Sequence, residues 1–87
     1  MNDLDPAWLR SFDAIARTGS VTRAAQQVHR TQSAVSTQLQ QLEASVGARL
    51  VERTTRSLTL TEQGENFLPH ARRLLALQDE ARASVAS

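Results

Sequence analysis

The sequence predicts a mainly helical fold in which four helices accompany one short hairpin. Apolar residues recur every three or four positions over most of the 87 residues, which is the period of amphipathic helices. Residues that favour helix N-caps stand before four of these segments. Residues 49–60 differ, because apolar and β-branched residues alternate there around a polar, Thr-rich centre, as is typical of strands.

The first helix is expected over residues 6–17. Asp5 is a suitable N-cap, Pro6 is favoured at the first helical position, and Gly19 is typical of the residue that follows a helix. One side of this helix is apolar and should pack in the core, while the other side stays in water. The apolar residues are Trp8, Leu9, Phe12, Ile15 and Ala16.

Two more helices are expected in close succession. A short helix follows Ser20, and a longer one follows Thr31 and ends at Gly47. Because only about three residues separate these helices, they must cross steeply as a helix-turn-helix. Ala24 and Ala25 fit this prediction, since their small side chains allow a close crossing.

A hairpin over residues 49–60 would form a two-stranded wing beside the helix-turn-helix. The full prediction is therefore a winged helix-turn-helix domain over residues 1–60, followed by a long linker helix over residues 61–87. Thr61 can cap that last helix, which would be roughly 37 Å long and would reach beyond the small core. Pro69 should kink it or mark a change in its buried face.

The last helix carries an apolar stripe, which is best explained by a second copy of the chain packing against it. We therefore expect a homodimer formed through this helix. The predicted dimer contacts are Leu68, Ala71, Leu74, Leu75, Gln78, Ala81 and Val85.

The formal net charge of +1 hides an uneven distribution along the chain. Residues 1–13 have a net charge of −2, residues 14–60 of +4, and residues 61–87 of −1. Every cation in the middle region is an arginine, whose planar guanidinium suits phosphates and guanine edges. Ordinary solvated surface charge is the simpler explanation of these arginines. The charge alone does not distinguish it from binding to nucleic acid.

Composition weighs against several other classes of protein. Cysteine is absent, and His29 and His70 stand alone, so we expect no disulfide, no metal site and no cofactor. No apolar run approaches the roughly 20 residues of a membrane span, and the first residues do not resemble a secretion signal. We expect a cytoplasmic protein without a membrane partner.

The polar side of the third helix is the strongest candidate for a functional surface. It carries amides and hydroxyls but no charge, whereas an ordinary solvent-exposed helix usually carries Glu and Lys. Amides and hydroxyls can donate to and accept from base edges in the DNA major groove. A merely polar surface helix would also satisfy the pattern. The residues are Gln32, Ser33, Ser36, Thr37, Gln40 and Gln41.

Arginines flank this helix on both sides. Arg23 and Arg30 border the turn, and Arg53 and Arg56 lie on the expected wing, where they could neutralise phosphates. Arg56, at the wing tip, is the best candidate to enter a narrow minor groove. An ordinary loop charge is the alternative.

These residues together resemble the N-terminal domain of LysR-type transcriptional regulators. The resemblance covers nearly the whole chain. The matching segments are Phe12, GSVTRAA at 19–25, TQSAVSTQLQQLE at 31–43, Gly47, Leu50, ERT at 52–54 and LTLTEQG at 58–64. So many matches in one order and spacing make the resemblance specific.

The resemblance implies a bacterial regulator that binds an interrupted palindrome in double-stranded DNA as a homodimer. A C-terminal domain, not contained in this chain, would sense a small-molecule effector. Recognition would fall on residues 31–46 and wing contacts on residues 53–57. The predicted DNA contacts are Ser20, Thr22, Arg23, Arg30, Thr31, Gln32, Ser33, Ser36, Thr37, Gln38, Arg53, Thr54 and Arg56.

The chain departs from the family pattern at three positions. Many members have arginine where this chain has Thr37, so a strong guanine or phosphate contact would be lost here. Many have phenylalanine at the position of Val51, which leaves a smaller side chain beneath the wing. Val28 replaces the usual leucine before the turn.

Two other classes of function are alternatives for this sequence. A protein-interaction module could use the same helical surfaces, with incidental arginines, and would not bind duplex DNA at low ionic strength. An enzyme would need a nucleophile and a base with an orienting group. His29 has Ser33 four residues on but no third group, so catalysis is not expected.

Overall fold

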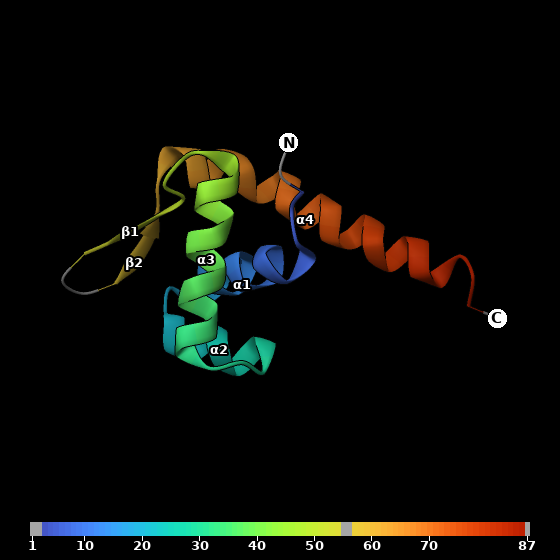
Figure 1. Cartoon of the computed structure of the whole chain (residues 1–87), viewed down its shortest axis with the longest axis horizontal. Helices are drawn as coiled ribbons and strands as arrows, with labels where there is room; N and C mark the ends of the chain where they lie inside the picture. The colour runs from blue at the N-terminus through green and yellow to red at the C-terminus, as the bar shows by residue number, and fades with distance from the viewer. Residues whose placement is uncertain (1–2, 55–56, 87) are drawn as a thin grey trace.

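Helix α1 lies at the centre of the protein and contacts the three other helices and the second strand (Figure 1). The computed structural model describes residues 3–54 and 57–86. Its elements are α1 (Pro6–Thr18), α2 (Val21–Val28), α3 (Gln32–Val46), β1 (Val51–Arg53), β2 (Leu58–Leu60) and α4 (Glu62–Ala83). The predicted fold, a winged helix-turn-helix followed by a long helix, is confirmed.

All four predicted N-caps are confirmed. In each, the side-chain oxygen accepts a hydrogen bond from a backbone N–H in the first turn, which satisfies a donor that the helix leaves unpaired. The donor–acceptor distances lie between 2.9 and 3.2 Å. The four caps are Asp5, Ser20, Thr31 and Thr61.

The turn between α2 and α3 is closed by a residue in the left-handed region. His29 has a φ of 58° and is the C-cap of α2. The next backbone N–H, of Arg30, donates to the carbonyl of Ala25 at 3.0 Å. Ala24 and Ala25 are buried, and α2 contacts both α1 and α3.

The core is aliphatic, with one pair of aromatic rings. Phe12, Ile15 and Leu42 are almost completely buried. The ring of Phe12 lies 5.9 Å from that of Phe67, centroid to centroid, so α4 begins its path against α1. Ser11 is a buried polar residue in this core, and its hydroxyl donates to the side-chain oxygen of Gln38 on α3.

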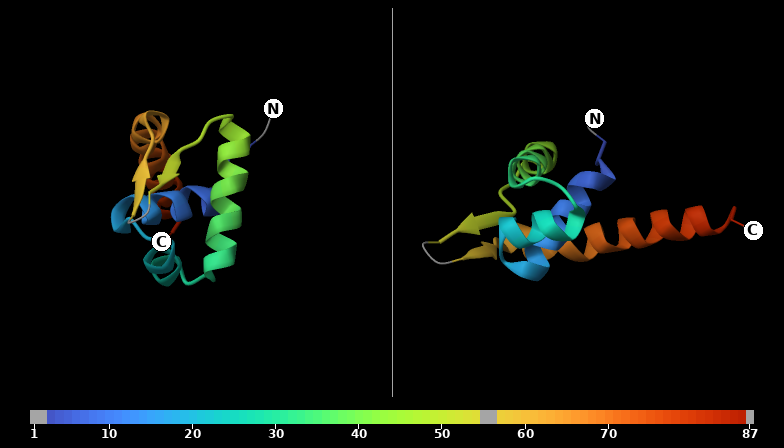
Figure 2. Two further views of the ribbon diagram at one scale, coloured as in Figure 1. Left: turned by 90° about the vertical axis from the view of Figure 1, so that its left-hand side faces the viewer. Right: turned by 90° about the horizontal axis from the view of Figure 1, so that it is seen from below.

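The two strands pair antiparallel, with Val51 opposite Leu60 and Arg53 opposite Leu58. Val51 is buried where the hairpin leaves the body of the protein. Figure 2 shows that the hairpin extends at one end of the molecule and that α4 runs toward the other end. The hairpin is therefore held at its base.

Helix α4 is continuous from Glu62 to Ala83 and includes Pro69. Its first half packs on α1. The guanidinium of Arg72 donates to the Asp13 carboxylate at 2.8 Å, and Arg17 donates to the same carboxylate at 3.1 Å. The second half leaves the core and projects beyond it (Figure 2).

Candidate nucleic-acid interface

The polar side of α3 faces outward, as the sequence predicts. Gln32, Ser33 and Thr37 are exposed, and so are Gln40 and Gln41 further along the helix. Ser36 lies among them and is partly exposed. The opposite side is anchored by the buried residues Val35 and Leu42. The packing of the apolar side thus leaves a continuous row of uncharged hydrogen-bonding groups in solvent.

Gln38 does not belong to this row. Its side chain is partly buried, and its carboxamide oxygen accepts a hydrogen bond from the hydroxyl of Ser11 on α1. A buried hydroxyl needs such a partner, because an unpaired one is costly. The structure thus gives the oxygen of Gln38 an internal partner, and the DNA contact that the family resemblance implies for Gln38 stays a prediction.

The predicted contacts around the turn fall into two groups. Ser20 and Thr31 are caps, so their hydroxyl oxygens accept hydrogen bonds from Arg23 N–H and Ala34 N–H. Thr31 is exposed and Ser20 partly exposed, so each hydroxyl hydrogen can still be donated to a phosphate or base. The side chains of the second group, Thr22, Arg23 and Arg30, are exposed.

On the wing, Arg53 ends β1 and is exposed. Thr54 fixes the geometry that follows: its hydroxyl donates to the carbonyl of Ser57 at 2.9 Å and accepts from the Ser57 N–H at 3.0 Å. The predicted minor-groove contact, Arg56, lies outside the described residues. Among the described residues of the wing, Arg53 is the arginine whose position relative to α3 can be stated.

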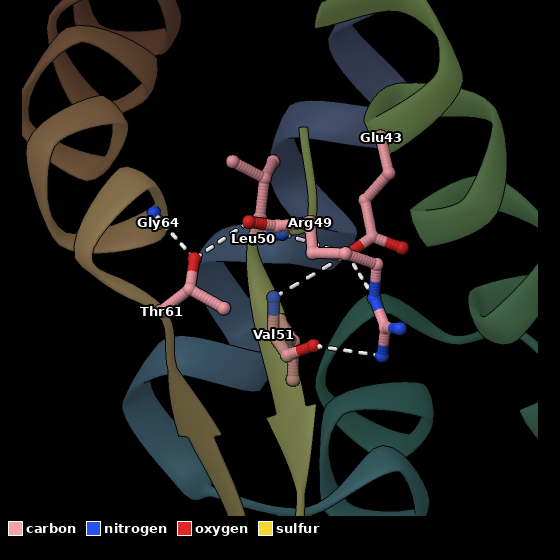
Figure 3. Close-up of polar contacts among 6 residues, drawn as sticks. All are labelled: Glu43, Arg49, Leu50, Val51, Thr61 and Gly64. Atoms are coloured by element: carbon pink, nitrogen blue, oxygen red, sulfur yellow. Dashed lines mark hydrogen bonds and ion pairs between the residues drawn. The ribbon is translucent and has the colours of Figure 1, made fainter. Parts of the chain in front are cut away.

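The C-terminal half of α3 holds the base of the wing (Figure 3). The carboxylate of Glu43 accepts hydrogen bonds from the N–H groups of Leu50 at 2.7 Å and Val51 at 3.3 Å. Arg49 approaches the same carboxylate at 3.8 Å and donates to the Val51 carbonyl at 3.4 Å. Charge-assisted hydrogen bonds of this kind are stronger than neutral ones, so the start of β1 is fixed to α3.

Thr61 fixes the other side of the same segment (Figure 3). Its hydroxyl donates to the Arg49 carbonyl at 2.6 Å and accepts from the Gly64 N–H at 3.0 Å. Its own N–H donates to the Leu50 carbonyl at 3.0 Å. A Cβ built on Gly64 would lie 2.0 Å from that carbonyl oxygen, so only glycine allows α4 to approach this closely.

The stripe on α4 differs from the predicted one. Ala71 is 0% exposed and is covered by the chain's own core, so its side chain cannot contact a second copy. Leu68, Leu75 and Gln78 are partly buried, and the two leucines pack against the core. Among the described residues, the exposed large apolar side chains are Leu74 at 43%, Leu77 at 59% and, beyond the end of α4, Val85 at 86%. Ala81 is also exposed.

The roles of several residues do not follow from the sequence pattern. Leu77 was not assigned to the stripe, although it lies one helical turn from Leu74 and Ala81. Glu43 and Gly64 belong to the segments that match the family, but the sequence predicts no physical role for them. The internal contact of Ser11 has no local signal, because its partner is on another helix.

Two other kinds of site are absent from the described part of the chain. Residues 3–54 and 57–86 contain no group of three or more His, Asp or Glu side chains that could hold a metal ion. In the same residues, no helix has the length and apolar character that a membrane crossing requires.

Similar sequences are bacterial regulators. The family described as "Bacterial regulatory helix-turn-helix protein, lysR family" matches residues 6–65. The chain is 48% identical over 77 residues to the HTH-type transcriptional regulator DgdR of Burkholderia cepacia, covering 88% of this chain and 26% of DgdR. It is 47% identical over 83 residues to the regulator PecT of Dickeya dadantii, covering 95% of this chain and 26% of PecT. The chain thus spans about a quarter of the length of these relatives.

Solved structures give the same result. A CbnR_DBD–DNA complex superimposes with a TM-score of 0.82 at 37% identity, covering 94% of this chain and 99% of that one. Vibrio fischeri DarR, also solved with DNA, gives a TM-score of 0.91 at 32% identity, covering 98% of this chain and 29% of that one. Fold, family motif and sequence identity agree, and the chain belongs to the lysR family of bacterial regulatory helix-turn-helix proteins.

Proposed function

We propose that this chain is the sequence-specific DNA-binding part of a LysR-type transcriptional regulator. Residues 1–60 bind duplex DNA, and residues 61–87 form the linker through which two copies pair. The recognition helix enters the major groove, and the wing lies against the neighbouring backbone or minor groove. The observation that carries the proposal is the uncharged, exposed face of α3 with arginines on either side of it.

The chemistry of the side chains determines which residues we propose to read bases and which to bind phosphates. Gln32, Ser33 and Thr37 offer donors and acceptors to base edges, where sequence is read. Arg23, Arg30 and Arg53 offer charge to phosphates, which gives affinity without sequence information. Thr31, Ser36, Ser20, Thr22 and Thr54 add neutral hydrogen bonds around this surface. Gln38 is not included, because its oxygen already serves Ser11.

The main test is a selection of bound duplexes from a random pool, followed by binding measurements on the selected sequence. Gln32→Ala and Thr37→Ala should each change the preferred bases, with a loss of about 1 to 3 kcal/mol on the wild-type site. Gln63→Ala, at an exposed position at the start of α4, is the matched control and should leave the preference unchanged. Equal weakening on all sequences would contradict the assignment of base reading to α3.

The same experiment separates DNA binding from a protein-interaction module. Duplex binding should weaken steeply as salt rises, because bound arginines release counterions from phosphates. Arg53→Ala should reduce the slope of log affinity against log salt by the amount expected when about one phosphate contact is lost. If the wild-type chain does not bind duplex DNA even at low ionic strength, the proposal fails and the interaction module becomes the better explanation.

The proposed dimer rests on the exposed part of α4. Leu74 and Leu77 are large apolar side chains in solvent, and burying them against a second copy removes that exposure. Leu77→Glu should therefore yield monomers with much weaker binding to a two-half-site duplex, as measured by sedimentation and titration. Ala76→Glu places the same charge beside Arg72, on the side toward α1, and should stay dimeric.

Effector sensing would belong to a further domain of the whole regulator, as the length of the relatives suggests. Since the relatives are transcriptional regulators, we propose no catalytic activity for this part. A protein that binds operator DNA works where the bacterial chromosome is, in the cytoplasm.

A further inference from the structure

A cleft of about 380 Å³ lies between α3 and the base of the wing. Ser36, Gln40 and Glu43 line it from α3, and Arg49 and Arg53 line it from the opposite side. Apolar side chains, including the buried Val51, line it as well. Two guanidinium groups, an amide and a hydroxyl therefore border one hollow, which suits an anion with several acceptor oxygens.

Arg49 is held in position although its side chain is 74% exposed. The Glu43 carboxylate binds the two N–H groups that follow Arg49, and Thr61 binds the Arg49 carbonyl (Figure 3). The guanidinium also donates to the Val51 carbonyl. A cation that is already ordered loses little conformational freedom when it binds a partner.

Glu43 offsets only one of the two arginine charges at the cleft, so the lining keeps a net positive charge. Its carboxylate already accepts two backbone N–H bonds at 2.7 and 3.3 Å, whereas the Arg49 guanidinium lies 3.8 Å away. The side chain of Glu43 is only 15% exposed. The carboxylate thus serves both the backbone and Arg49, and the remaining N–H groups of the exposed guanidinium are available toward solvent.

The position of the cleft determines which anion it would meet. A helix in the major groove and a wing at the neighbouring minor groove lie on either side of one sugar–phosphate strand, because that strand separates the two grooves. Resting on the proposed function, we propose that the cleft holds a backbone phosphate of this strand, with Arg49 and Gln40 as its ligands beside Arg53. Arg49 is then a direct phosphate contact that adds affinity without reading bases, and it is not among the DNA contacts predicted from the sequence.

The test compares Arg49→Gln with Arg82→Gln, using the 87-residue chain and a duplex selected from a random pool. Each variant loses one positive charge, but Arg82 is in the last turn of α4, at the end of the molecule away from the wing (Figure 2). Arg49→Gln should weaken binding on the order of tenfold. It should reduce the slope of log affinity against log salt by about 0.9, with unchanged base preference.

A second measurement locates the contact. Single uncharged methylphosphonate linkages are placed in turn along the duplex, and affinity is measured for each. The affinity of the wild-type protein should fall when the uncharged linkage replaces the phosphate that the cleft holds. The affinity of Arg49→Gln should not change at that linkage but should still fall at the other contacted phosphates. Gln40→Ala, at an exposed position, removes an uncharged ligand of the same phosphate. For this variant, the uncharged linkage at that phosphate should reduce affinity less than it does for the wild-type protein.

The results separate this inference from the proposed function. Suppose that the wild-type protein binds the duplex, but Arg49→Gln matches Arg82→Gln in affinity, in salt slope and in its response to each uncharged linkage. The proposed phosphate site in the cleft is then wrong, while the proposed DNA binding stands. If Gln40→Ala changes base preference, Gln40 reads a base and its assignment to the phosphate is wrong. If wild-type protein binds no duplex, both ideas fail.

Discussion

The two halves of α3 are built for different tasks, although both lie within the family motif. Toward the N-terminus, Gln32, Ser33 and Thr37 are exposed and uncharged. Toward the C-terminus, Glu43 is largely buried and accepts hydrogen bonds from Leu50 and Val51 at the start of the wing. The exposed side chains near the N-terminus can contact another molecule, whereas Glu43 stabilises the start of the wing.

This difference shows that a motif residue can be needed for the interface or for the fold that carries it. Substitution of the exposed residues Gln32, Ser33 and Thr37 should change sequence preference while leaving stability nearly unchanged. Substitution of Glu43 should reduce stability, and DNA affinity should fall equally on all sequences. The predictions below test this division, beginning with the largest expected effect.

Gly64→Ala should destabilise the protein most. The added Cβ would lie 2.0 Å from the Leu50 carbonyl oxygen, and neither backbone can move without breaking the Thr61 contacts. We expect a loss of about 3 kcal/mol or more in the free energy of unfolding, measured by chemical denaturation. Gly47→Ala is the control: its Cβ meets nothing within 4 Å, and its φ of 74° should cost only about 1 kcal/mol. Equal losses would show that α4 does not depend on close approach to Leu50.

Glu43→Ala should have the next largest effect. It leaves the N–H groups of Leu50 and Val51 without their carboxylate partner, which should cost about 2 kcal/mol of unfolding free energy. Glu52→Ala, on the exposed side of the wing, should change stability by less than about 0.5 kcal/mol. A Glu43→Ala variant that keeps full stability but prefers a different duplex would contradict the division between the two halves.

His29→Gly should have the smallest effect, and it should be favourable. The φ of 58° at His29 is strained for a residue with a Cβ, although glycine also loses more chain entropy on folding. A net gain of about 0.5 kcal/mol is expected in thermal or chemical unfolding. His29→Ala keeps the Cβ and should give no gain. Base preference should stay the same in both variants, since the turn supports α3 without reading DNA.

The sequence by itself determined the helix boundaries and the inward sides of the helices. Asp5, Ser20, Thr31 and Thr61 cap N–H groups only two or three residues away, so the cause and the effect lie within one turn of the chain. The same locality let the alternation of residues 49–60 predict the wing. The outward face of α3 followed from the helical period once Val35 and Leu42 were assigned to the core.

Only the tertiary structure decided which of the remaining side chains are free. The contacts of Gln38 with Ser11 and of Asp13 with Arg72 join residues 27 and 59 positions apart, and no local pattern encodes such pairs. On α4, the period alone did not show that Leu75 packs inward while Leu77 stays exposed. That distinction depends on where α4 crosses α1, which is fixed by long-range contacts between Phe12 and Phe67 and between Gly64 and Leu50.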